Sequence, residues 1–366
     1  PSYSRIKSAL TAIKESNDLE LYLVLSASAV IDRYGNVAEV VESDGFEIAE
    51  KVHCSVESSL PLGMVKTTGL SILDLGSVFS RVKPDIVVTI ADRFETLATS
   101  IAASYQNIPL VHIQGGEVTG SIDEKVRHAN TKLADIHFVA TEAARNNVVG
   151  MGEVPESVHN TGCPSVDLAR DVFDSPVLDF NPVEKYTGVG HIHDWHDNYV
   201  VVLQHSVTSE YDKAGQHISE TLHAVNEFGL PVFWFWPNID VGTDGLASGI
   251  RRFREHHPDM NAYFIKNMDS TDFLKLCVNA KCLIGNSSVG VRECSYLGVP
   301  VINIGDRQEG RERSANVIDC DYSRADITEA ISEQVRHGPY SRSMLYGDGQ
   351  AGARIAKLLE NIEMGS

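Results

Sequence analysis

The sequence predicts an α/β fold built from two doubly wound, Rossmann-like domains. Its 366 residues exceed the ordinary size of a single domain. Short apolar runs alternate along the chain with amphipathic segments of helical length. The runs are rich in Val and Ile, which is typical of strands buried on both faces of a parallel sheet.

In the first half of the chain, apolar runs predict strands at residues 19–27, 85–91, 108–114, 136–141 and 158–163. The segments 93–105 and 123–134, which lie between such runs, are predicted helices. After about residue 170, a stretch rich in Pro, Gly and Asp indicates a linker.

In the second half, strands are predicted at residues 198–205, 230–236, 261–266, 281–288 and 299–305. The last segment, 351–362, has a helical apolar face. We therefore expect a first domain over residues 1–175, a second over 190–340, and a C-terminal helix within 345–366 that packs back on the first domain.

The charge balance excludes several classes of protein. The 50 acidic and 31 basic side chains give a net charge of −19, whereas a nucleic-acid binder needs a basic surface. No apolar run approaches the roughly 18 residues of a membrane span, and the N-terminus does not have the pattern of a signal peptide. The six cysteines include no CxxC pair, so we expect a reduced, cytoplasmic protein without a structural metal.

Polar clusters follow predicted strands, where ligands of open parallel sheets bind. They occupy residues 91–95, 114–124, 204–210, 236–240 and 285–293. Because these clusters belong to both domains, we expect a ligand in a cleft that the two domains face.

The segment GNSSVGVRE is the clearest candidate anion site. Asn286, Ser287 and Ser288 follow a strand, and Gly290 would let the backbone approach a phosphate at the start of a helix. Glu293, about two turns into that helix, is suited to accept hydrogen bonds from ribose hydroxyls. The alternative interpretation is an ordinary Ser N-cap.

A second basic cluster, GDRQEGRER, places Arg307, Arg311 and Arg313 close to this site, where they would neutralise a diphosphate. The alternative interpretation is a solvated charged loop.

Candidate acid–base groups follow three other strands. Asp92 comes directly after a strongly apolar strand, and its alternative role is the N-cap of the next helix. Asp123 is either catalytic or a helix N-terminal acid. His205 ends a strand, a position that favours function, whereas His112 and His137 lie within apolar runs and are interpreted as core histidines.

At these motifs the sequence resembles the hydrolysing UDP-N-acetylglucosamine 2-epimerases of sialic-acid-type biosynthesis, over nearly the whole chain. The segments that carry the resemblance are IDRYGN (31–36), ADRFE (91–95), HIQGGEVTGSIDE (112–124), RHANTKLADIHF (127–138), GCPSVD (162–167), LQHSVT (203–208), WPNIDVG (236–242), GNSSVGVRE (285–293) and INIGDRQEGRE (302–312).

The resemblance implies a glycosyltransferase-B-like architecture and the anti elimination of UDP to a 2-acetamidoglucal, followed by hydration that releases N-acetylmannosamine. It implies no metal or redox cofactor, and a homodimer or homotetramer. The residues that match catalytic positions of the family are Asp92, Asp123 and His205. Those that match or accompany nucleotide-contacting positions are Arg93, Asn238, Ser287, Ser288, Gly290, Glu293 and Arg307.

Three features depart from the family pattern. The family opens with a strand and a TGTRADY-type turn, and we expect this first strand to be missing from the start of the sequence. Ala29 stands where several members carry His, and Gln114 replaces a catalytic Glu. An amide cannot be a general base, so Gln114 is expected to orient the sugar, with Glu117 as a nearby carboxylate.

Three alternatives remain open from the sequence. The first is a related hydrolysing epimerase that acts on another nucleotide sugar, such as UDP-N,N′-diacetylbacillosamine. The second is a retaining glycosyltransferase, since one fold hosts many functions. The third is a sugar-nucleotide sensor without turnover, which the presence of Gln114 keeps open.

Overall fold

The computed structural model describes residues 2–31, 37–56, 61–119, 122–237 and 243–362. The chain divides into two compact units: unit 1 comprises residues 1–118, 122–167 and 346–366, and unit 2 comprises 119–121 and 168–345. The division falls inside helix α7 (Pro164–Asp174), somewhat before the boundary at residue 175 that the sequence predicted.

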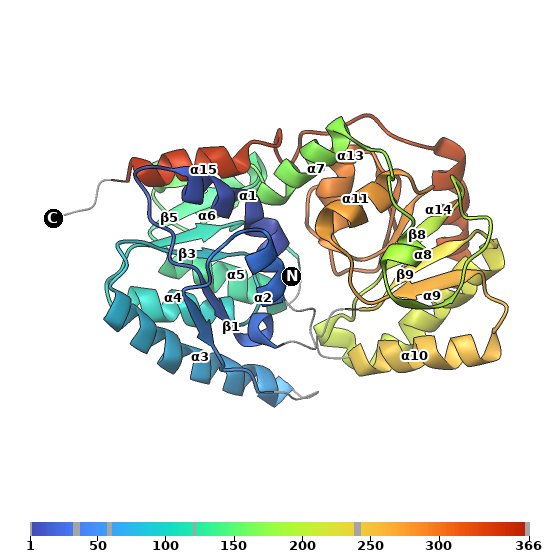
Figure 1. Cartoon of the computed structure of the whole chain (residues 1–366), viewed down its shortest axis with the longest axis horizontal. Helices are drawn as coiled ribbons and strands as arrows, with labels where there is room; N and C mark the ends of the chain where they lie inside the picture. The colour runs from blue at the N-terminus through green and yellow to red at the C-terminus, as the bar shows by residue number, and fades with distance from the viewer. Residues whose placement is uncertain (1, 32–36, 57–60, 120–121, 238–242, 363–366) are drawn as a thin grey trace. The chain divides into compact units, whose positions relative to one another are not determined.

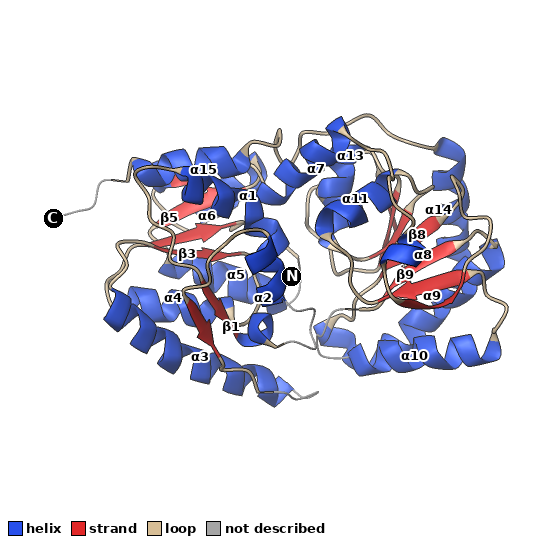
Figure 2. Ribbon diagram, viewed as in Figure 1, coloured by secondary structure: helices blue, strands red, loops and turns tan. Residues whose placement is uncertain are grey.

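Unit 1 carries parallel strands with helices on both faces (Figures 1 and 2). Its strands form a four-stranded parallel sheet of order β3-β4-β5-β6 and a separate parallel pair, β1-β2. The strands are β1 (Val24–Ser26), β2 (Glu50–Val52), β3 (Val87–Ile90), β4 (Leu110–Ile113), β5 (Ile136–Val139) and β6 (Val158–Asn160). The helices are α1 (Ser2–Glu15), α2 (Val37–Ser43), α3 (Pro61–Val82), α4 (Thr96–Ser104), α5 (Ile122–Leu133), α6 (Glu142–Gly150), the first part of α7, and α15 (Ala351–Glu360).

An apolar core covers each face of the four-stranded sheet. The central strand β4 is therefore buried on both faces. On one face, Val111 and Ile113 pack with α1 and α15, including Ile355. On the other, Leu110 packs with α3 and α4. The carboxylate of Asp167 accepts hydrogen bonds from the first backbone N–H groups of α15, 2.9 and 2.7 Å long, so this helix begins against unit 1.

Unit 2 contains a seven-stranded sheet of order β13-β12-β11-β8-β9-β10-β7, in which β7 alone runs antiparallel to its neighbour. The strands are β7 (Gly188–His191), β8 (Val200–Leu203), β9 (Val232–Phe235), β10 (Ala262–Ile265), β11 (Leu283–Gly285), β12 (Val301–Ile304) and β13 (Val317–Cys320). The helices are α8 (Pro182–Lys185), α9 (Ala214–Phe228), α10 (Thr243–His256), α11 (Ser270–Val278), α12 (Ser288–Val291), α13 (Glu293–Leu297) and α14 (Arg324–His337).

The linker prediction after residue 170 is wrong, because this segment contains α8 and the edge strand β7. The sequence GVGH has little strand propensity. It pairs with β10 because glycine permits the close approach: a Cβ on Gly190, whose φ is +103°, would lie 2.3 Å from the carbonyl oxygen of Ala262. Strands β2 and β13 were also not predicted, while the ten predicted strands each contain an observed one.

Candidate functional site

In unit 1, Asp92 lies directly beyond the carboxyl end of β3 and is buried. Its Oδ2 accepts a hydrogen bond from Nη2 of Arg127 on α5, a side chain that is also fully buried. Nη1 of Arg127 donates to the carbonyl oxygen of Glu117 at 2.6 Å, and Nη1 of Arg5 lies 3.6 Å from Asp92 Oδ1. The two guanidinium groups hold this carboxylate in one orientation.

Asp92 does not cap a helix. Helix α4 begins at Thr96 instead of residue 93, and its N-cap, Glu95, makes no side-chain capping bond. Arg93, a predicted nucleotide contact, directs Nε and Nη2 to the Glu95 carboxylate at 3.1–3.2 Å. The N-cap interpretation of Asp92 is therefore wrong, and Arg93 forms an ion pair with Glu95.

The backbone directly after β3 and directly after β4 adopts an unusual conformation. Ala91 and Gln114 follow neighbouring strands, and both have φ of +63°, in the left-handed region that costs an L-residue about 1–2 kcal/mol. The carbonyl of Ala91 accepts a hydrogen bond from Nε2 of His112 at 2.9 Å, and Nδ1 of His112 lies 3.1 Å from Oγ1 of Thr131. Strain of this kind concentrates at functional sites.

The ionisation state of His112 follows from its burial. Desolvation lowers the pKa of the imidazole to about 4, so the ring is neutral near pH 7. A carbonyl only accepts, so Nε2 carries the proton toward Ala91 and Nδ1 accepts from the Thr131 hydroxyl. The histidine is a buried structural group, as predicted, and it holds the turn that presents Asp92.

Gln114 is buried at the end of β4. Its Nε2 donates to Sγ of Cys163 at 2.9 Å, and that sulfur lies 3.0 Å from the hydroxyl of Ser165. Its Oε1 is buried and has no hydrogen-bond partner among the described residues. The side chain thus presents one buried acceptor, which fits a ligand hydroxyl or amide N–H.

The other two predicted carboxylates differ in environment. Glu117 is buried in the segment after β4, whereas Asp123 is half-buried in the first turn of α5. The position of Asp123 therefore agrees with its interpretation as a helix N-terminal acid. Arg127 lies one turn further along the same helix, on the side that reaches Asp92.

In unit 2, Asn286 joins the ends of three strands. Its side-chain Oδ1 accepts from the backbone N–H of His205 at 2.7 Å, and its Nδ2 donates to the carbonyl of His205 at 2.9 Å. Its own carbonyl accepts from Nη1 of Arg307 at 3.2 Å and from Nε2 of Gln308 at 2.8 Å. The Asn286 amide therefore fixes the loop that carries His205, a buried side chain, and Asn286 follows the strand β11 as predicted.

The segment after β11 is helical as predicted, but its helix is not continuous. The helix is interrupted at Arg292, where ψ is −77°, so Glu293 begins α13 and is not two turns into one helix. Gly290 serves packing: a Cβ there would lie 2.8 Å from Cγ1 of Val301. Ser287 is the N-cap of α12, and its hydroxyl accepts weakly from Val289 N–H at 3.5 Å.

Two buried side-chain oxygens at the carboxyl ends of the unit 2 strands are available as hydrogen-bond acceptors. Oε2 of Glu293 is buried, as is Oγ of Ser206 beyond β8, and neither atom has a hydrogen-bond partner among the described residues. Ser288 is buried at the start of α12. Such atoms are costly unless a ligand or water satisfies them, so this edge is suited to a ligand with several hydroxyl groups.

The arginines of the basic loop after β12 contact different partners. Arg307 contacts Asn286 and is half-buried. Arg313 instead pairs with Asp319 at 3.0–3.2 Å, and Arg311 donates to Gln308. Arg313 is therefore held by Asp319, and the neutralisation of a diphosphate by the three arginines stays a prediction. Asn238 lies outside the described residues.

Sequence reasoning missed Arg127 and the positioning role of Asn286. Both lay inside quoted motifs, but their partners are 35 and 81 residues away in the chain. The available signal for Arg127 was its position one turn after Asp123 on a predicted helix, since residues four apart share a helix face.

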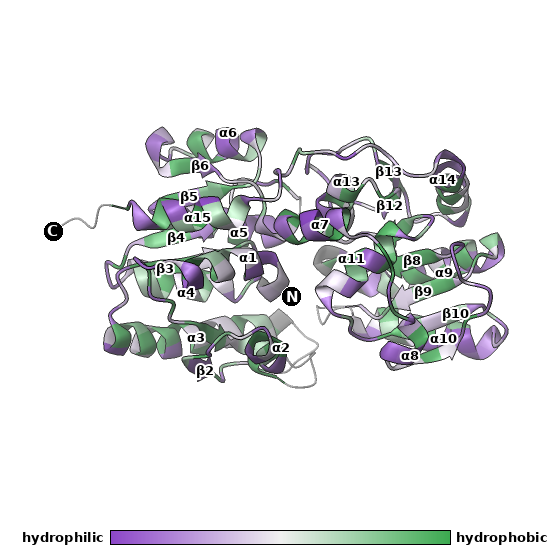
Figure 3. Ribbon diagram, turned by 45° about the horizontal axis from the view of Figure 1, so that its top comes forward, coloured by the Kyte–Doolittle hydropathy of each residue, from purple (hydrophilic) through white to green (hydrophobic). Residues whose placement is uncertain are grey.

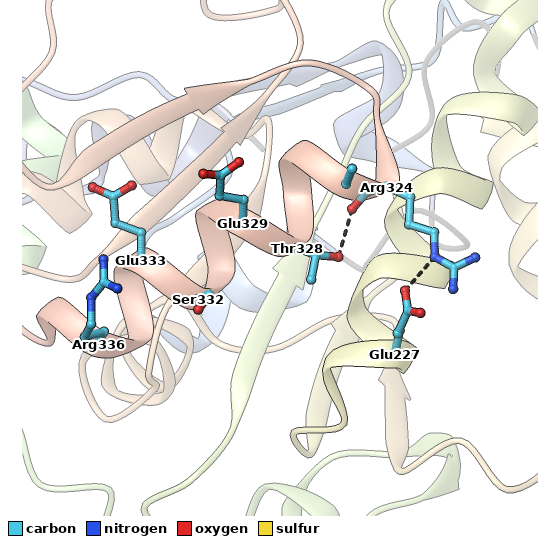
Figure 4. Close-up of a pocket in the computed structure, with 8 residues that line it drawn as sticks. Glu227, Arg324, Thr328, Glu329, Ser332, Glu333 and Arg336 are labelled. Atoms are coloured by element: carbon cyan, nitrogen blue, oxygen red, sulfur yellow. Dashed lines mark hydrogen bonds and ion pairs between the residues drawn. The ribbon is translucent and has the colours of Figure 1, made fainter.

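A surface hollow on unit 2 lies along α14 and beside the end of α9 (Figure 4). Its edge includes an ion pair between Arg324 Nε and Glu227 Oε2, 2.6 Å apart. The lining residues are Glu227, Arg324, Ala325, Thr328, Glu329, Ser332, Glu333 and Arg336. None of the candidate site residues lines this hollow, so we do not assign the site to it.

Two features are absent from the described ranges of the chain. No helix there is both long enough and apolar enough to cross a membrane. Within the same ranges, no three His, Cys, Asp or Glu side chains are grouped as metal ligands would be.

The fold and the two sets of strand-end residues define a two-unit α/β protein with candidate acid–base groups on both sheets. The chain belongs to the UDP-N-acetylglucosamine 2-epimerase family, whose sequence profile matches residues 11–360. This confirms the resemblance drawn from the motifs.

Curated relatives match over the full length. The UDP-N,N′-diacetylbacillosamine 2-epimerase (hydrolyzing) of Legionella pneumophila is 31% identical over 100% of this chain and 94% of that protein. The UDP-N-acetylglucosamine 2-epimerase of Neisseria meningitidis is 28% identical over 99% of this chain and 93% of that protein.

Solved structures confirm the α/β, glycosyltransferase-B-like fold class. Staphylococcus aureus MnaA in complex with UDP has a TM-score of 0.80 at 18% identity, over 98% of this chain and 92% of that one. The Neisseria meningitidis UDP-GlcNAc 2-epimerase bound to UDP-GlcNAc has a TM-score of 0.80 at 17% identity, over 98% of this chain and 96% of that one.

Proposed function

We propose that this protein is a hydrolysing UDP-sugar 2-epimerase. The observation that carries the proposal is the buried Asp92 carboxylate, oriented by Arg127 at the end of β3, in a chain of this family. The names of the Legionella relative and of a Campylobacter jejuni relative, 27% identical over 86% of this chain, include the hydrolysing reaction.

The nucleotide is assigned to unit 2. The diphosphate binds at Ser287, Ser288 and Arg307, and the ribose hydroxyls donate to Glu293. Support comes from the unpartnered Oε2 of Glu293 and from the position of Arg307 beside Asn286. A cationic side chain and hydroxyl donors stabilise the charge that develops on a departing diphosphate.

The acid–base groups are Asp92, Asp123 and His205. In the first step a carboxylate removes the proton at C2 of the sugar, the C1–O bond breaks, and UDP leaves with the bonding electrons to give a glycal. In the second step water adds its hydroxyl to C1 while a proton returns to C2 on the opposite face. Asp92 suits the base because Arg127 fixes its orientation.

Gln114 is assigned to sugar orientation. Its buried Oε1 accepts from a ring hydroxyl or from the N–H of an acetamido group. Gln114 cannot act as a base, so Asp92 and Asp123 carry the proton transfers. The backbone carbonyl of Glu117 accepts a hydrogen bond from Arg127, which holds Glu117 near that side chain.

The substrate is UDP-N-acetylglucosamine or UDP-N,N′-diacetylbacillosamine. The first is the substrate in the family description, and the second appears in the name of the 31% identical Legionella relative. Both carry the 2-acetamido group and the C2 proton that the elimination requires.

Incubation with each nucleotide sugar in D₂O tests the proposal. We expect UDP and a free 2-epimeric sugar carrying deuterium at C2, from whichever substrate is accepted. Release of UDP only when an acceptor sugar is added would indicate a glycosyltransferase. UDP binding without turnover of either nucleotide sugar would indicate a sensor, and either result would overturn the proposal.

A further inference from the structure

Cys163 contacts the candidate sugar-binding residue Gln114, although the proposed reaction gives it no role. It stands between the end of β6 and the start of α7, in the segment GCPSVD, and its side chain is fully buried. Its sulfur accepts a hydrogen bond from Nε2 of Gln114 at 2.9 Å. The same sulfur lies 3.0 Å from the hydroxyl of Ser165, which is buried as well. Buried polar contacts therefore lead from the first turn of α7 to Gln114.

The backbone of Gln114 is fixed at the carboxyl edge of the four-stranded sheet. Gln114 follows β4 and Cys163 follows β6, and β5 lies between these two strands (Figure 3). The Gln114 side chain therefore spans the end of β5. Its backbone N–H donates to the carbonyl of Phe138 in β5 at 2.8 Å, and its φ is +63°. The sheet thus fixes where the side chain begins, and Cys163 binds the amide at its far end.

Cys163 is itself anchored to the part of the chain that returns to unit 1. Its backbone N–H donates to the carbonyl of Tyr346 at 2.8 Å. Gly162 has a φ of +80°, and a Cβ there would lie 3.2 Å from Cα of Gly347, so two glycines allow the segments to approach closely. Asp167, at the other end of GCPSVD, accepts from the first backbone N–H groups of α15. The thiol is therefore held in place by contacts of its own segment.

The hydrogen bond to the sulfur decides which end of the Gln114 amide is available to a ligand. The last torsion of a glutamine side chain has a broad energy profile, so the amide rotates unless a partner fixes it. Here Nε2 is directed to Cys163, and Oε1 is buried with no hydrogen-bond partner among the described residues. Oγ of Ser165 can accept the thiol proton, which leaves a sulfur lone pair for the amide. A buried amide oxygen held in this way requires a donor, and a sugar offers O–H and N–H groups.

We propose that Cys163 is a positioning residue for the sugar, with Ser165 as its hydrogen-bond partner. The thiol holds the Gln114 amide so that Oε1 accepts from a hydroxyl or from an acetamido N–H. Cys163 acts through Gln114 and needs no contact with the sugar. The identity of the ligand as a nucleotide sugar rests on the proposed function, whereas the contact between Cys163 and Gln114 does not.

Calorimetric titration with UDP and with a UDP-sugar separates the contacts of the sugar from those of the nucleotide. The full chain carrying Asp92→Asn is used throughout, because the proposed base is then absent and the probes, UDP-N-acetylglucosamine and UDP-N,N′-diacetylbacillosamine, persist. Adding Cys163→Ala should weaken binding of the accepted UDP-sugar about tenfold and change UDP affinity less than about twofold, since only the amide loses its partner. Cys163→Ser, which retains an acceptor, should keep the UDP-sugar affinity within about threefold of the parent.

Two controls separate positioning from general destabilisation. Cys54 is matched to Cys163, because it is buried in unit 1 and its sulfur lies 2.9 Å from the hydroxyl of Ser71. Cys54→Ala should therefore leave both affinities unchanged. In a chain that already carries Gln114→Leu, Cys163→Ala should have no further effect on UDP-sugar affinity, because the two residues act as one unit. A role of Cys163 in packing alone would weaken binding in that chain too.

Unchanged UDP-sugar affinity in Cys163→Ala overturns the inference, as does a Cys163→Ser variant that binds as weakly as Cys163→Ala. An equal loss of UDP affinity, a loss that persists with Gln114→Leu, a loss reproduced by Cys54→Ala, or failure to bind either UDP-sugar also overturns it. A wild type that binds a UDP-sugar without releasing UDP from it, while the variants show the expected losses, overturns the proposed function instead and leaves the positioning role intact.

Discussion

Replacing Arg127 by methionine should destabilise the protein strongly. Loss of one partner of a buried ion pair costs about 3–5 kcal/mol, because the remaining charge stays desolvated. Both Arg127 and Asp92 are buried, so this range applies. The lower end, about 3 kcal/mol, is expected because Arg5 remains 3.6 Å from the carboxylate.

Removing the other partner, by Asp92→Asn, should lower the free energy of unfolding by about 2 kcal/mol, the value of a hydrogen bond to a charged group. This value is expected because Arg127 keeps its bond to the Glu117 carbonyl. In the double variant neither charge is present. Its cost should fall about 2 kcal/mol below the sum of the single costs, which is within the range for residues in direct contact.

Urea unfolding of the wild type, both single variants and the double variant measures this coupling. Arg5→Met with Asp92→Asn is the matched control cycle. Because Arg5 is 26% exposed and 3.6 Å away, its coupling should be below about 1 kcal/mol. If the Arg127 and Asp92 costs are additive within about 0.5 kcal/mol, the proposed ion pair does not hold the carboxylate.

The same variants address catalysis. At a temperature where each is folded, Asp92→Asn should lower turnover about 100-fold, the contribution typical of a positioned acid–base group. Near-normal turnover in folded Asp92→Asn would leave Asp92 a structural ion-pair partner and remove its catalytic role.

Three further predictions concern single residues. Burial lowers the pKa of His112 from 6.5 to about 4, so the stability that depends on the neutral ring is present above pH 6.5 and lost as pH falls toward 4. In urea unfolding, the free energy of unfolding of His112→Gln should therefore decline less steeply over this pH range than that of the wild type. Equal slopes for the two proteins would contradict this. Asn286→Asp should reduce turnover at least tenfold, because a carboxylate cannot donate to the His205 carbonyl; unchanged kcat in steady-state assays would refute the positioning role. Glu293→Ala should weaken UDP binding about tenfold in calorimetric titration while Glu293→Gln, which retains an acceptor, weakens it less, and equal affinities in all three proteins would exclude the ribose contact.

Much of the fold was predictable because strands in a parallel sheet are buried on both faces and therefore appear as apolar runs. The runs around β4, β9, β10 and β12 are all fully buried, and each was recognised. Strand β7 was not, because two glycines give it no apolar signal and its pairing depends on a close approach to β10.

The chemical composition of the candidate site was also readable from the sequence, since polar clusters after strands must reach the carboxyl edge of a sheet. Asp92, Gln114, His205 and Glu293 were found in this way. Their partners were not, because a hydrogen bond between distant residues has no local pattern. Only the tertiary structure brings Arg127 to Asp92 and Asn286 to His205. The sequence alone determined which groups stand at the strand ends, and the packing of helices and loops around those ends decided how each group is held.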